Sequence, residues 1–370
     1  MKIVVKTLLV MLITIIGLFS LYILTLQIFE YRPEEVMVLE IIDNPEAENA
    51  NLVPLASAIT ILSFNIGYAS LSATEDFAMD GGTKGRMDSR AEVEANLAGI
   101  ATILTNAEAD IYLLQEVDDG SARSYRTLQQ DYFHEHLGVS STLGYNYRCL
   151  FVPFPFNPSQ MMGQVRSGIG SFIPYHVESA IRYQLPGSFS WPISLANLKR
   201  CIVVSRLPIA DSDKYLVIVN VHLSAYDDGS MRLAEMEKLK EIILEEADNG
   251  NYVIVGGDFN QTFPAAVTSA AEADPEYLYP LRDPSFWEAF PMESAWFLEN
   301  GFVFAVDVAT PTCRLLHQPY DSDNPENNQY YVIDGFIVSA NVEIIGVETL
   351  AEGFLHSDHN PVRLTIRLVP

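Results

Sequence analysis

The longest apolar run in the chain lies near its N-terminus. Residues 7–29 contain no charged side chain and consist mainly of Leu, Ile, Val and Phe. A helix of this length can cross a hydrocarbon core of ~30 Å. The pattern therefore predicts a transmembrane helix over residues 7–29, preceded by a short segment, residues 1–6. A cleaved secretory signal is the alternative, but the run is longer than a usual signal core and no small-x-small cleavage site follows it closely.

The charges on either side of this run predict its orientation. Lys2 and Lys6 precede it, whereas Glu30, Glu34 and Glu35 follow it. Basic residues remain on the cytoplasmic side of a membrane span. We therefore expect a single-pass protein whose N-terminus is cytoplasmic and whose remaining chain is extracytoplasmic. A cleaved signal would export the same residues.

The pattern changes after the apolar run. Residues 30–57 mix acidic residues, Asn and Pro without a regular period, which indicates an acidic linker, with a short strand expected at residues 36–42. From residue 58 onward, β-type apolar runs alternate with helical stretches, and no internal repeat divides them. One catalytic domain over residues 58–370 is the simplest division of the chain.

Two helices and one irregular region stand out within this domain. Residues 88–109 predict an amphipathic helix capped by Asp88 or Ser89, and residues 232–248 predict a second helix. Each leads into a run that carries an acid. Residues 146–198 are rich in Pro and aromatic residues and poor in charge, so we expect long loops and edge strands around the mouth of a site. They would form either a substrate wall that could face a membrane or an ordinary hydrophobic cover over a sheet.

Charge and cysteine content narrow the class of protein. A net charge of -26 and a pI near 4.5 argue against binding nucleic acid through a broad basic surface. They do not exclude a nuclease, because a bound divalent cation can neutralise phosphate locally. Cys149, Cys201 and Cys313 are widely spaced and indicate neither a zinc knuckle nor a dense disulfide framework. We expect Cys201 to be a small buried hydrophobe, and one disulfide remains open as an alternative.

Polar residues interrupt or follow six β-type runs. Asp258 and Asn260 come directly after the apolar run 252–255, and Asp358 and His359 lie in the stretch 356–361. The other four are Asn65, Glu116, His222 and Asp334. Taken singly, each is explained as a turn former, a solvated acid or a core histidine. Together they supply the groups needed to hold a divalent cation, activate water and stabilise developing negative charge, which indicates a metal-assisted phosphoester hydrolase.

In the order Asn, Glu, His, Asp-x-Asn, Asp, Asp-His, these residues resemble the endonuclease/exonuclease/phosphatase superfamily. The most specific matches are residues 114–116, 257–260 and 357–361. The resemblance implies an α/β (α+β) fold, a four-layer sandwich of two packed mixed β-sheets flanked by helices. The pattern agrees, because short apolar strands with interspersed helices must bury both faces of each sheet.

The resemblance also implies roles for these residues. Glu116 looks like the principal metal carboxylate, and Asn65 beside it would touch the metal or the phosphate. Asp358 would bind the metal directly or support its ligands from behind, and oxygen ligands imply Mg2+ or Mn2+. Asp258 resembles the residue that activates the attacking water. Asn260 resembles a donor to the phosphorus centre, His359 a phosphate contact oriented by Asp334, and His222 the second histidine.

Further candidates lie in two loops, and one position departs from the family. Lys84 and Arg86 in the glycine-containing segment 76–86, and Arg123 just beyond Glu116, are candidate substrate-binding cations; the alternative for the segment is a flexible surface loop. Gly335 stands after Asp334 where many relatives have an aromatic residue.

The sequence thus predicts a metal-dependent phosphoesterase that uses in-line attack of water on a phosphodiester or phosphomonoester. The acidity, the anchor and the aromatic stretch favour a lipid head group or a small organic phosphate as substrate. An extracellular nuclease acting on DNA or RNA is the alternative within the same fold, and a non-catalytic membrane-tethered binding module is the alternative of another class. Beyond the substrate and the membrane, no protein partner is inferred.

Overall fold

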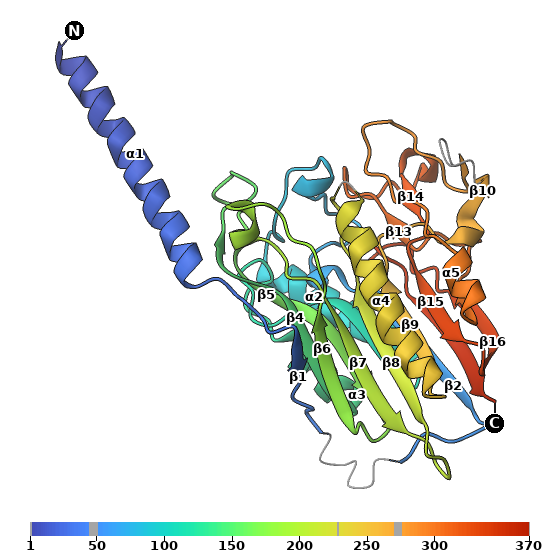
Figure 1. Cartoon of the computed structure of the whole chain (residues 1–370). Coiled ribbons are helices and arrows are strands. Elements are labelled where there is room, and N and C mark those ends of the chain that lie inside the picture. The colour runs from blue at the N-terminus through green and yellow to red at the C-terminus, as the bar shows by residue number, and fades with distance from the viewer. Residues whose placement is uncertain (1, 44–50, 228, 270–275, 370) are drawn as a thin grey trace.

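The structure is a computed structural model that describes residues 2–43, 51–227, 229–269 and 276–369. Residues 44–50 of the expected linker lie outside this described part. Helix α1 (Lys2–Ile28) projects from the body of the molecule, as Figure 1 shows. Within the described residues it alone is long and apolar enough to cross a membrane. The remaining helices pack against two large sheets.

Each large sheet is mixed, as the sequence predicts. The first has the strand order β1-β6-β7-β8-β9-β15-β12, in which β8 and β9 are parallel. The second has the order β16-β17-β2-β3-β5-β4, in which β2 and β3 are parallel. The strands of the first sheet are β1 (Val36–Val38), β6 (Ser179–Gln184), β7 (Cys201–Pro208), β8 (Tyr215–His222), β9 (Tyr252–Asp258), β12 (Phe302–Ala305) and β15 (Asp334–Ser339). Those of the second are β2 (Ala58–Asn65), β3 (Ile111–Asp118), β4 (Ser140–Val152), β5 (Gly163–Ile173), β16 (Val342–Thr349) and β17 (Val362–Leu368).

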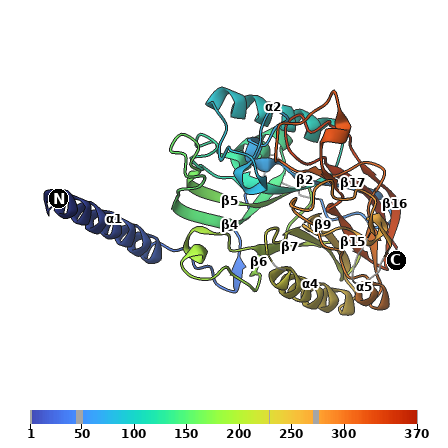
Figure 2. The same ribbon diagram turned by 90° about the horizontal axis from the view of Figure 1, so that it is seen from above.

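The two sheets bury an apolar core between them, and helices cover their outer faces. Side chains of Ile61 and Leu113 from one sheet pack with Ile218 and Ile254 from the other. Helices α2 (Arg90–Asn106) and α3 (Gln129–Leu137) cover the second sheet, while α4 (Ser230–Asp248) and α5 (Ala295–Glu299) cover the first. Figure 2 shows the resulting order of layers from above. The four-layer sandwich is confirmed.

Short elements complete the end of the sandwich where the site lies. The small strand pairs are β10 (Val267–Ser269) with β11 (Glu276–Tyr277) and β13 (Cys313–Arg314) with β14 (Tyr330–Tyr331). Single 3-10 turns are η1 (Gly67–Ala69), η2 (Ala78–Asp80), η3 (Ile193–Ala196), η4 (Pro264–Ala266) and η5 (Pro325–Asn327).

Local sequence explains most of these boundaries. Helix α2 begins after Ser89, whose hydroxyl accepts a hydrogen bond from the backbone N–H of Glu92, as expected for a capping serine. In β2, Ile61 packs between the sheets while Leu62 and Phe64 pack beneath α2, so both faces of the strand are apolar.

The Pro-rich region differs in part from the prediction. Strand β4 is an edge strand, as expected, but β5 lies inside the sheet between β3 and β4. The segment 163–173 contains no proline and so can donate to both neighbours. The prolines at 153, 155, 158, 186 and 192 fall in the loops on either side.

Candidate active site

The polar strand-end residues meet at one end of the sandwich. Parallel pairing places His222 at the end of β8 directly beside Asp258 at the end of β9. Antiparallel pairing places Asp334 opposite Asp258 from the other side. Asp334 therefore starts β15 and does not end a strand, contrary to the expectation from the apolar run before it. The antiparallel direction brings it to the same end of the sheet.

Glu116 reaches the site through a bulge. Strand β3 runs on to Asp118, so Glu116 does not end the strand as expected. The pairing of β3 with β5 shifts register between Leu114 and Val117, and Glu116 has a φ of 57°. A bulge of this kind re-aims a side chain out of the regular alternation. The carboxylate of Glu116 thereby faces His222, with Oε1 4.0 Å from Nε2.

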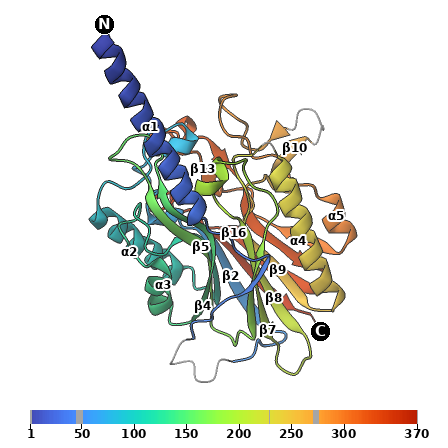
Figure 3. The same ribbon diagram turned by 60° about the vertical axis from the view of Figure 1, so that its left-hand side comes forward.

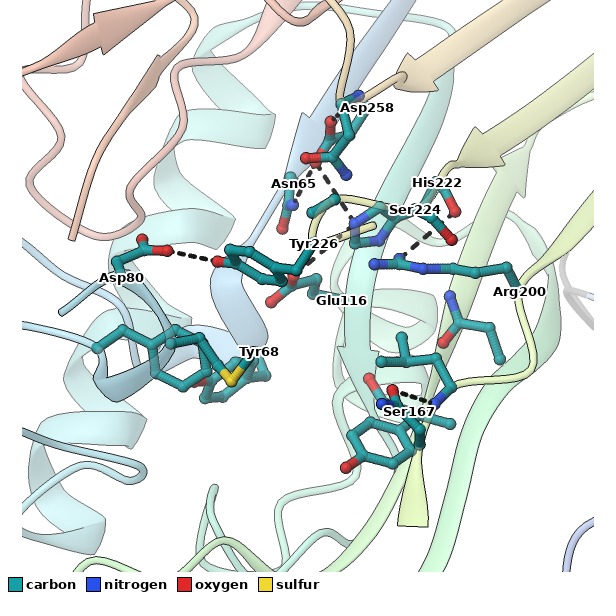
Figure 4. A pocket seen from close by; sticks show the side chains of 18 of the residues that line it. Asn65, Tyr68, Asp80, Glu116, Ser167, Arg200, His222, Ser224, Tyr226 and Asp258 are labelled. Carbon is teal, nitrogen blue, oxygen red and sulfur yellow. Dashed lines mark hydrogen bonds and ion pairs between the residues drawn. The ribbon is translucent and has the colours of Figure 1, made fainter. Parts of the chain in front are cut away.

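Asp258 contacts several members of the cluster, and Figure 4 shows it beside Asn65 and His222. Its Oδ2 accepts a hydrogen bond from Asn65 Nδ2 at 3.0 Å and lies 3.4 Å from His222 Nε2. His359 Nε2 is 3.8 Å from the same oxygen. Asp258 Oδ1 accepts a hydrogen bond from the backbone N–H of Asn260 at 2.9 Å. The carboxylate is therefore held from several directions.

His359 is oriented by Asp334. The distance from His359 Nδ1 to Asp334 Oδ2 is 2.8 Å, and both side chains are buried. Burial lowers the pKa of His359, but Asp334, Cys313 and Asp358 outweigh it and raise the pKa well above its usual range. The arrangement favours a charged imidazole whose Nε2 faces the carboxylates of Asp258 and Asp358.

The other titratable groups are shifted in different directions. Burial raises the pKa of Asp258 to about 7, and the charge of Asp334 adds to this. Burial likewise raises the pKa of Asp358 to about 7, with Glu116 adding to it. Burial lowers the pKa of His222 well below its usual range, helped by Arg200 and His359. The site therefore combines a neutral histidine, a charged histidine and two carboxyl groups that ionise near neutral pH.

The donor set fits a hard divalent cation. The carboxyl groups of Glu116, Asp258 and Asp358 all line one cavity, and burial destabilises the last two as anions. A cation relieves that cost, and oxygen donors suit Mg2+ or Mn2+. Ligand atoms already lie within 4.8 Å of one another in two groups: Asp258 with Asp334 and His359, and Cys313 with Asp358 and His359. His359 Nδ1 is committed to Asp334, which makes the first of these a hydrogen-bonded relay.

The amide side chains make contacts within the protein. Asn65 Oδ1 accepts from the N–H of Gly67 at 3.1 Å while its amide faces Asp258. Asn260 Nδ2 donates to the carbonyl of Leu223 at 2.8 Å. Both therefore fix neighbouring groups. Their roles as metal ligand and phosphate donor stay predictions.

A cavity of about 630 Å³ opens from this cluster. All eight predicted catalytic and metal residues except Asp334 line it, and Asp334 lies behind His359. Across its polar end, Tyr226 donates a hydrogen bond to Asp80 of η2, so two loops far apart in sequence meet there. Much of the remaining wall is apolar and comes from the two Pro-rich loops.

The three candidate substrate cations lie in different settings. Arg123 lines the cavity, but Nε and Nη2 bind Asp118 and the guanidinium lies 3.5 Å from the centre of the Tyr68 ring. Lys84 pairs with Glu75 and Asp88. Arg86 stacks on Tyr125 at 4.5 Å. Neither Lys84 nor Arg86 is among the cavity-lining residues, because acidic and aromatic neighbours hold both outside it.

Sequence reasoning missed three cavity residues. Arg200 lines the cavity beside His222 and donates to the carbonyl of that residue at 3.4 Å. The basic pair Lys199-Arg200, directly before an apolar run in an acidic chain, was the available signal. Arg314 is fully buried at the cavity wall and donates to backbone carbonyls at 2.9 and 3.1 Å. Neither Arg314 nor Tyr226 stands in a motif that would have singled it out.

The departure at Gly335 has a steric cause. A Cβ atom at this position would lie 2.8 Å from the ring of Phe263. Phe263 belongs to the loop after β9, directly before η4, and its buried ring fills the space beside Gly335. An aromatic ring from another segment thus packs where a side chain at 335 has no room.

The two stacked sheets and the carboxylate–histidine cluster at one end define the class of four-layer α/β proteins with a site built on strand-end loops. A sequence profile of the Endonuclease/Exonuclease/phosphatase family matches residues 62–359. The chain belongs to this family, whose members are generally hydrolases of phosphoester bonds. No curated protein sequence matches the chain significantly.

Solved structures show the same fold at low sequence identity. An endonuclease/exonuclease/phosphatase from Beutenbergia cavernae is 16% identical with a TM-score of 0.55, covering 84% of this chain and 72% of that one. A functionally unknown conserved protein from Enterococcus faecalis is 14% identical with a TM-score of 0.52, covering 84% and 100%. The human Nocturnin catalytic domain with bound sulfate is 16% identical with a TM-score of 0.50, covering 90% and 98%. At these identities the likeness concerns the fold.

Proposed function

We propose that this chain is a membrane-anchored, divalent-metal-dependent phosphoesterase whose catalytic domain lies on the extracytoplasmic side. The observation that carries the proposal is the convergence of Glu116, Asp258 and Asp358 with two histidines at the polar end of one cavity. Helix α1 supports the anchor because it is long and apolar enough to span a bilayer. The lysines before it and the glutamates after it favour the outward orientation.

The residues of the chain divide the chemistry among them. Glu116 and Asp358, with Asn65, would hold Mg2+ or Mn2+, which when bound neutralises charge on the phosphate oxygens. Asp258 accepts a proton from the attacking water as its oxygen bonds to phosphorus. A pKa of about 7 suits that role at neutral pH.

The leaving oxygen separates on the opposite side of phosphorus as the new bond forms. His359, kept charged by Asp334, supplies the proton that the leaving oxygen needs or binds a non-bridging oxygen. His222 is neutral, so its N–H is a hydrogen-bond donor to phosphate without a full charge. Arg200 adds a positive charge at the same end of the cavity.

Hydrolysis of bis-p-nitrophenyl phosphate by the full-length chain in detergent tests this proposal. We expect turnover that EDTA abolishes and Mg2+ or Mn2+ restores. Asp258→Asn should lower kcat by about 10²- to 10⁴-fold, the usual contribution of a positioned base. Asp213→Asn removes an exposed acid far from the cavity and serves as the matched control.

The alternatives give different results in the same assay. A non-catalytic binding module would turn over no substrate. A nuclease would cleave plasmid DNA faster than the small diester. Turnover that persists in EDTA, or that Asp258→Asn leaves unchanged, would rule the proposed chemistry out.

A further inference from the structure

The last turns of α1 are packed into the catalytic domain. Leu26 is 4% exposed and lies in an apolar cluster with Tyr147, Val152 and Leu195. Tyr22 Oη donates to the carbonyl of Phe151 at 3.0 Å. These contacts join the helix to the two Pro-rich loops, 149–165 and 184–198. Figure 3 shows α1 leaving the molecule at this end.

Two further contacts hold the same junction. Trp191 Nε1 donates to Gln27 Oε1 at 3.1 Å, and Lys199 pairs with Glu30 at 3.1 Å. Helix, loops and the chain just after the helix therefore form one packed unit.

The length of the free part of α1 sets the distance between domain and membrane. The residues from Thr7 to Leu21, which follow Lys6, are exposed and carry no charge. At ~1.5 Å per residue these residues span about 22 Å. A hydrocarbon core is ~30 Å thick, so the uncharged free part of α1 alone is too short to cross it. The loops that contact Tyr22 and Leu26 must then lie at the surface of the bilayer.

The composition of the two loops suits that position. Residues 149–165 and 184–198 contain no Asp, Glu, Lys, Arg or His, although the chain as a whole carries a net charge of -26. Large apolar side chains on them remain exposed: Phe156 (83%), Trp191 (64%), Ile193 (56%) and Phe151 (43%). Aromatic residues without neighbouring charge are typical of the membrane–water interface. A strongly acidic surface there would be unfavourable.

The cavity connects this apolar collar, residues 149–165 and 184–198, with the catalytic cluster. Its wall includes Tyr22 of α1 together with Val152, Phe154, Phe156 and Leu198. Asp258, Asp358 and His359 lie at its other end. A ligand that fills the cavity would have a phosphate at the catalytic end and an apolar portion at the end where α1 leaves the catalytic domain.

A protein partner would also fit an uncharged surface, but the covalent link to α1 places this surface against lipid. Building on the proposed function, we infer that the collar rests on the bilayer that contains α1 and that the substrate is a membrane lipid phosphoester. Its apolar chain lies along the collar side of the cavity and its phosphate lies against Asp258.

The position of the collar is tested by fluorescence, without reference to activity. The full-length chain is reconstituted in phosphatidylcholine vesicles with or without brominated acyl chains. We expect brominated lipid to quench tryptophan emission, and Trp191→Phe to remove most of that quenching. Emission that brominated lipid leaves unchanged, or quenching that Trp191→Phe leaves intact, would place the collar away from the bilayer and overturn the inference.

The substrate class is tested in the same vesicles. Phosphatidylcholine, phosphatidylglycerol, phosphatidylinositol and phosphatidic acid are each compared with their deacylated forms, and phosphate-containing products are measured by mass spectrometry. We expect kcat/KM for at least one lipid to exceed that of its deacylated form by about 10-fold or more, because burial of two or three methylenes supplies such a factor. Equal rates for lipid and deacylated form, or cleavage of neither, would overturn the lipid assignment.

Paired variants separate this inference from the proposed function. Phe151→Ser with Trp191→Ser changes two exposed collar residues that do not line the cavity. We expect it to lower lipid hydrolysis by about 10-fold relative to hydrolysis of bis-p-nitrophenyl phosphate. Leu298→Ser with Ile345→Ser removes comparable exposed apolar groups on α5 and β16, away from α1 (Figure 1), and should leave that ratio unchanged. Metal-dependent cleavage of the soluble diester without any effect of the collar variant would preserve the proposed function and refute the inference.

Discussion

At the scale of single residues, the site depends on neighbours that push ionisation in opposite directions. Asp258 lies between a histidine whose pKa is lowered and a histidine whose pKa is raised. The two pKa values differ because His359 is hydrogen-bonded to the negatively charged Asp334, whereas His222 lies beside the positively charged Arg200. Two imidazoles at similar distances from one carboxylate are thereby suited to different tasks.

Asp334→Asn tests how far His359 depends on its partner. The amide keeps the shape of the side chain but removes the negative charge, so the pKa of His359 should fall. If the charged imidazole is the active form, activity is lost as pH rises through that pKa, and the alkaline limb of the pH–rate profile should move to lower pH. We also expect kcat to fall by about 10²-fold. An alkaline limb that stays in place would show that Asp334 acts only in packing.

Metal binding should weaken as the pH falls. Asp258 and Asp358 have folded-state pKa values of about 7, above the usual carboxyl value, so between about pH 4 and 7 the metal-free folded state binds protons that the unfolded state has released. Their contribution therefore stabilises the metal-free protein as pH falls, while a cation must displace those protons. The increase in Tm produced by Mg2+ should shrink from pH 8 to pH 6.

Asp358→Asn is the control for this experiment. It removes one of the two titrating groups, so the remaining Mg2+ effect on Tm should be smaller and less dependent on pH. A Tm increase that is constant from pH 8 to pH 6 in the unaltered chain would contradict the assignment of these carboxyl groups to the metal.

At the scale of elements, glycines in β9 allow the strand to place Asp258. Gly257 has a φ of 154°, and a Cβ atom there would lie 2.0 Å from the carbonyl oxygen of Val221 in β8. A side chain at this position would therefore force apart the two parallel strands that carry His222 and Asp258. The glycine is required by the close approach of two backbones.

Gly257→Ala should accordingly cost about 1–3 kcal/mol of the free energy of unfolding, the range for overpacking with a backbone shift. Chemical denaturation of the metal-free protein measures it. Gly346→Ala in β16 is the matched control, because nothing lies within 4 Å of a Cβ atom there, and it should change stability by no more than about 0.5 kcal/mol. Equal effects of the two substitutions would disprove the steric argument.

Strand periodicity and motif order predicted which helices and strands form better than they predicted where each strand begins, ends or bulges. Helix α2, helix α4 and the strands leading to Asn65, His222 and Asp258 lie where the pattern placed them. The bulge at Glu116 and the position of Asp334 at a strand start were not predicted, because both depend on pairing partners distant in sequence. Lys84 and Arg86 lie outside the cavity because they contact Glu75 and Tyr125, and no local sequence pattern connects these neighbours with them.

At the scale of the whole molecule, a buried polar bridge joins the two sheets behind the site. Gln115 Nε2 in β3 donates to Asn220 Oδ1 in β8 at 2.8 Å, and Asn220 Nδ2 donates to the carbonyl of Gly170 at 2.9 Å. Gln115 immediately precedes the bulged Glu116. The bridge therefore fixes the spacing between the sheet that carries Glu116 and the sheet that carries Asp258.

Gln115→Leu and Asn220→Leu should each cost about 1–3 kcal/mol of the free energy of unfolding, because each leaves a buried polar partner unsatisfied. The double substitution should cost less than the sum of the two, since it removes both partners of their mutual hydrogen bond. Denaturant unfolding of the four proteins measures the coupling. Strict additivity would mean that the bridge contributes nothing beyond its separate members.

In the proposed membrane-anchored enzyme, the packing of the last turns of α1 against the catalytic domain would hold that domain in a fixed position at the bilayer surface. An enzyme held in this way samples only molecules that diffuse laterally within its own leaflet, so encounters take place in two dimensions. Its turnover should follow the mole fraction of substrate at the surface, and diluting that substrate with an inert amphiphile should slow the reaction even when its bulk concentration is constant.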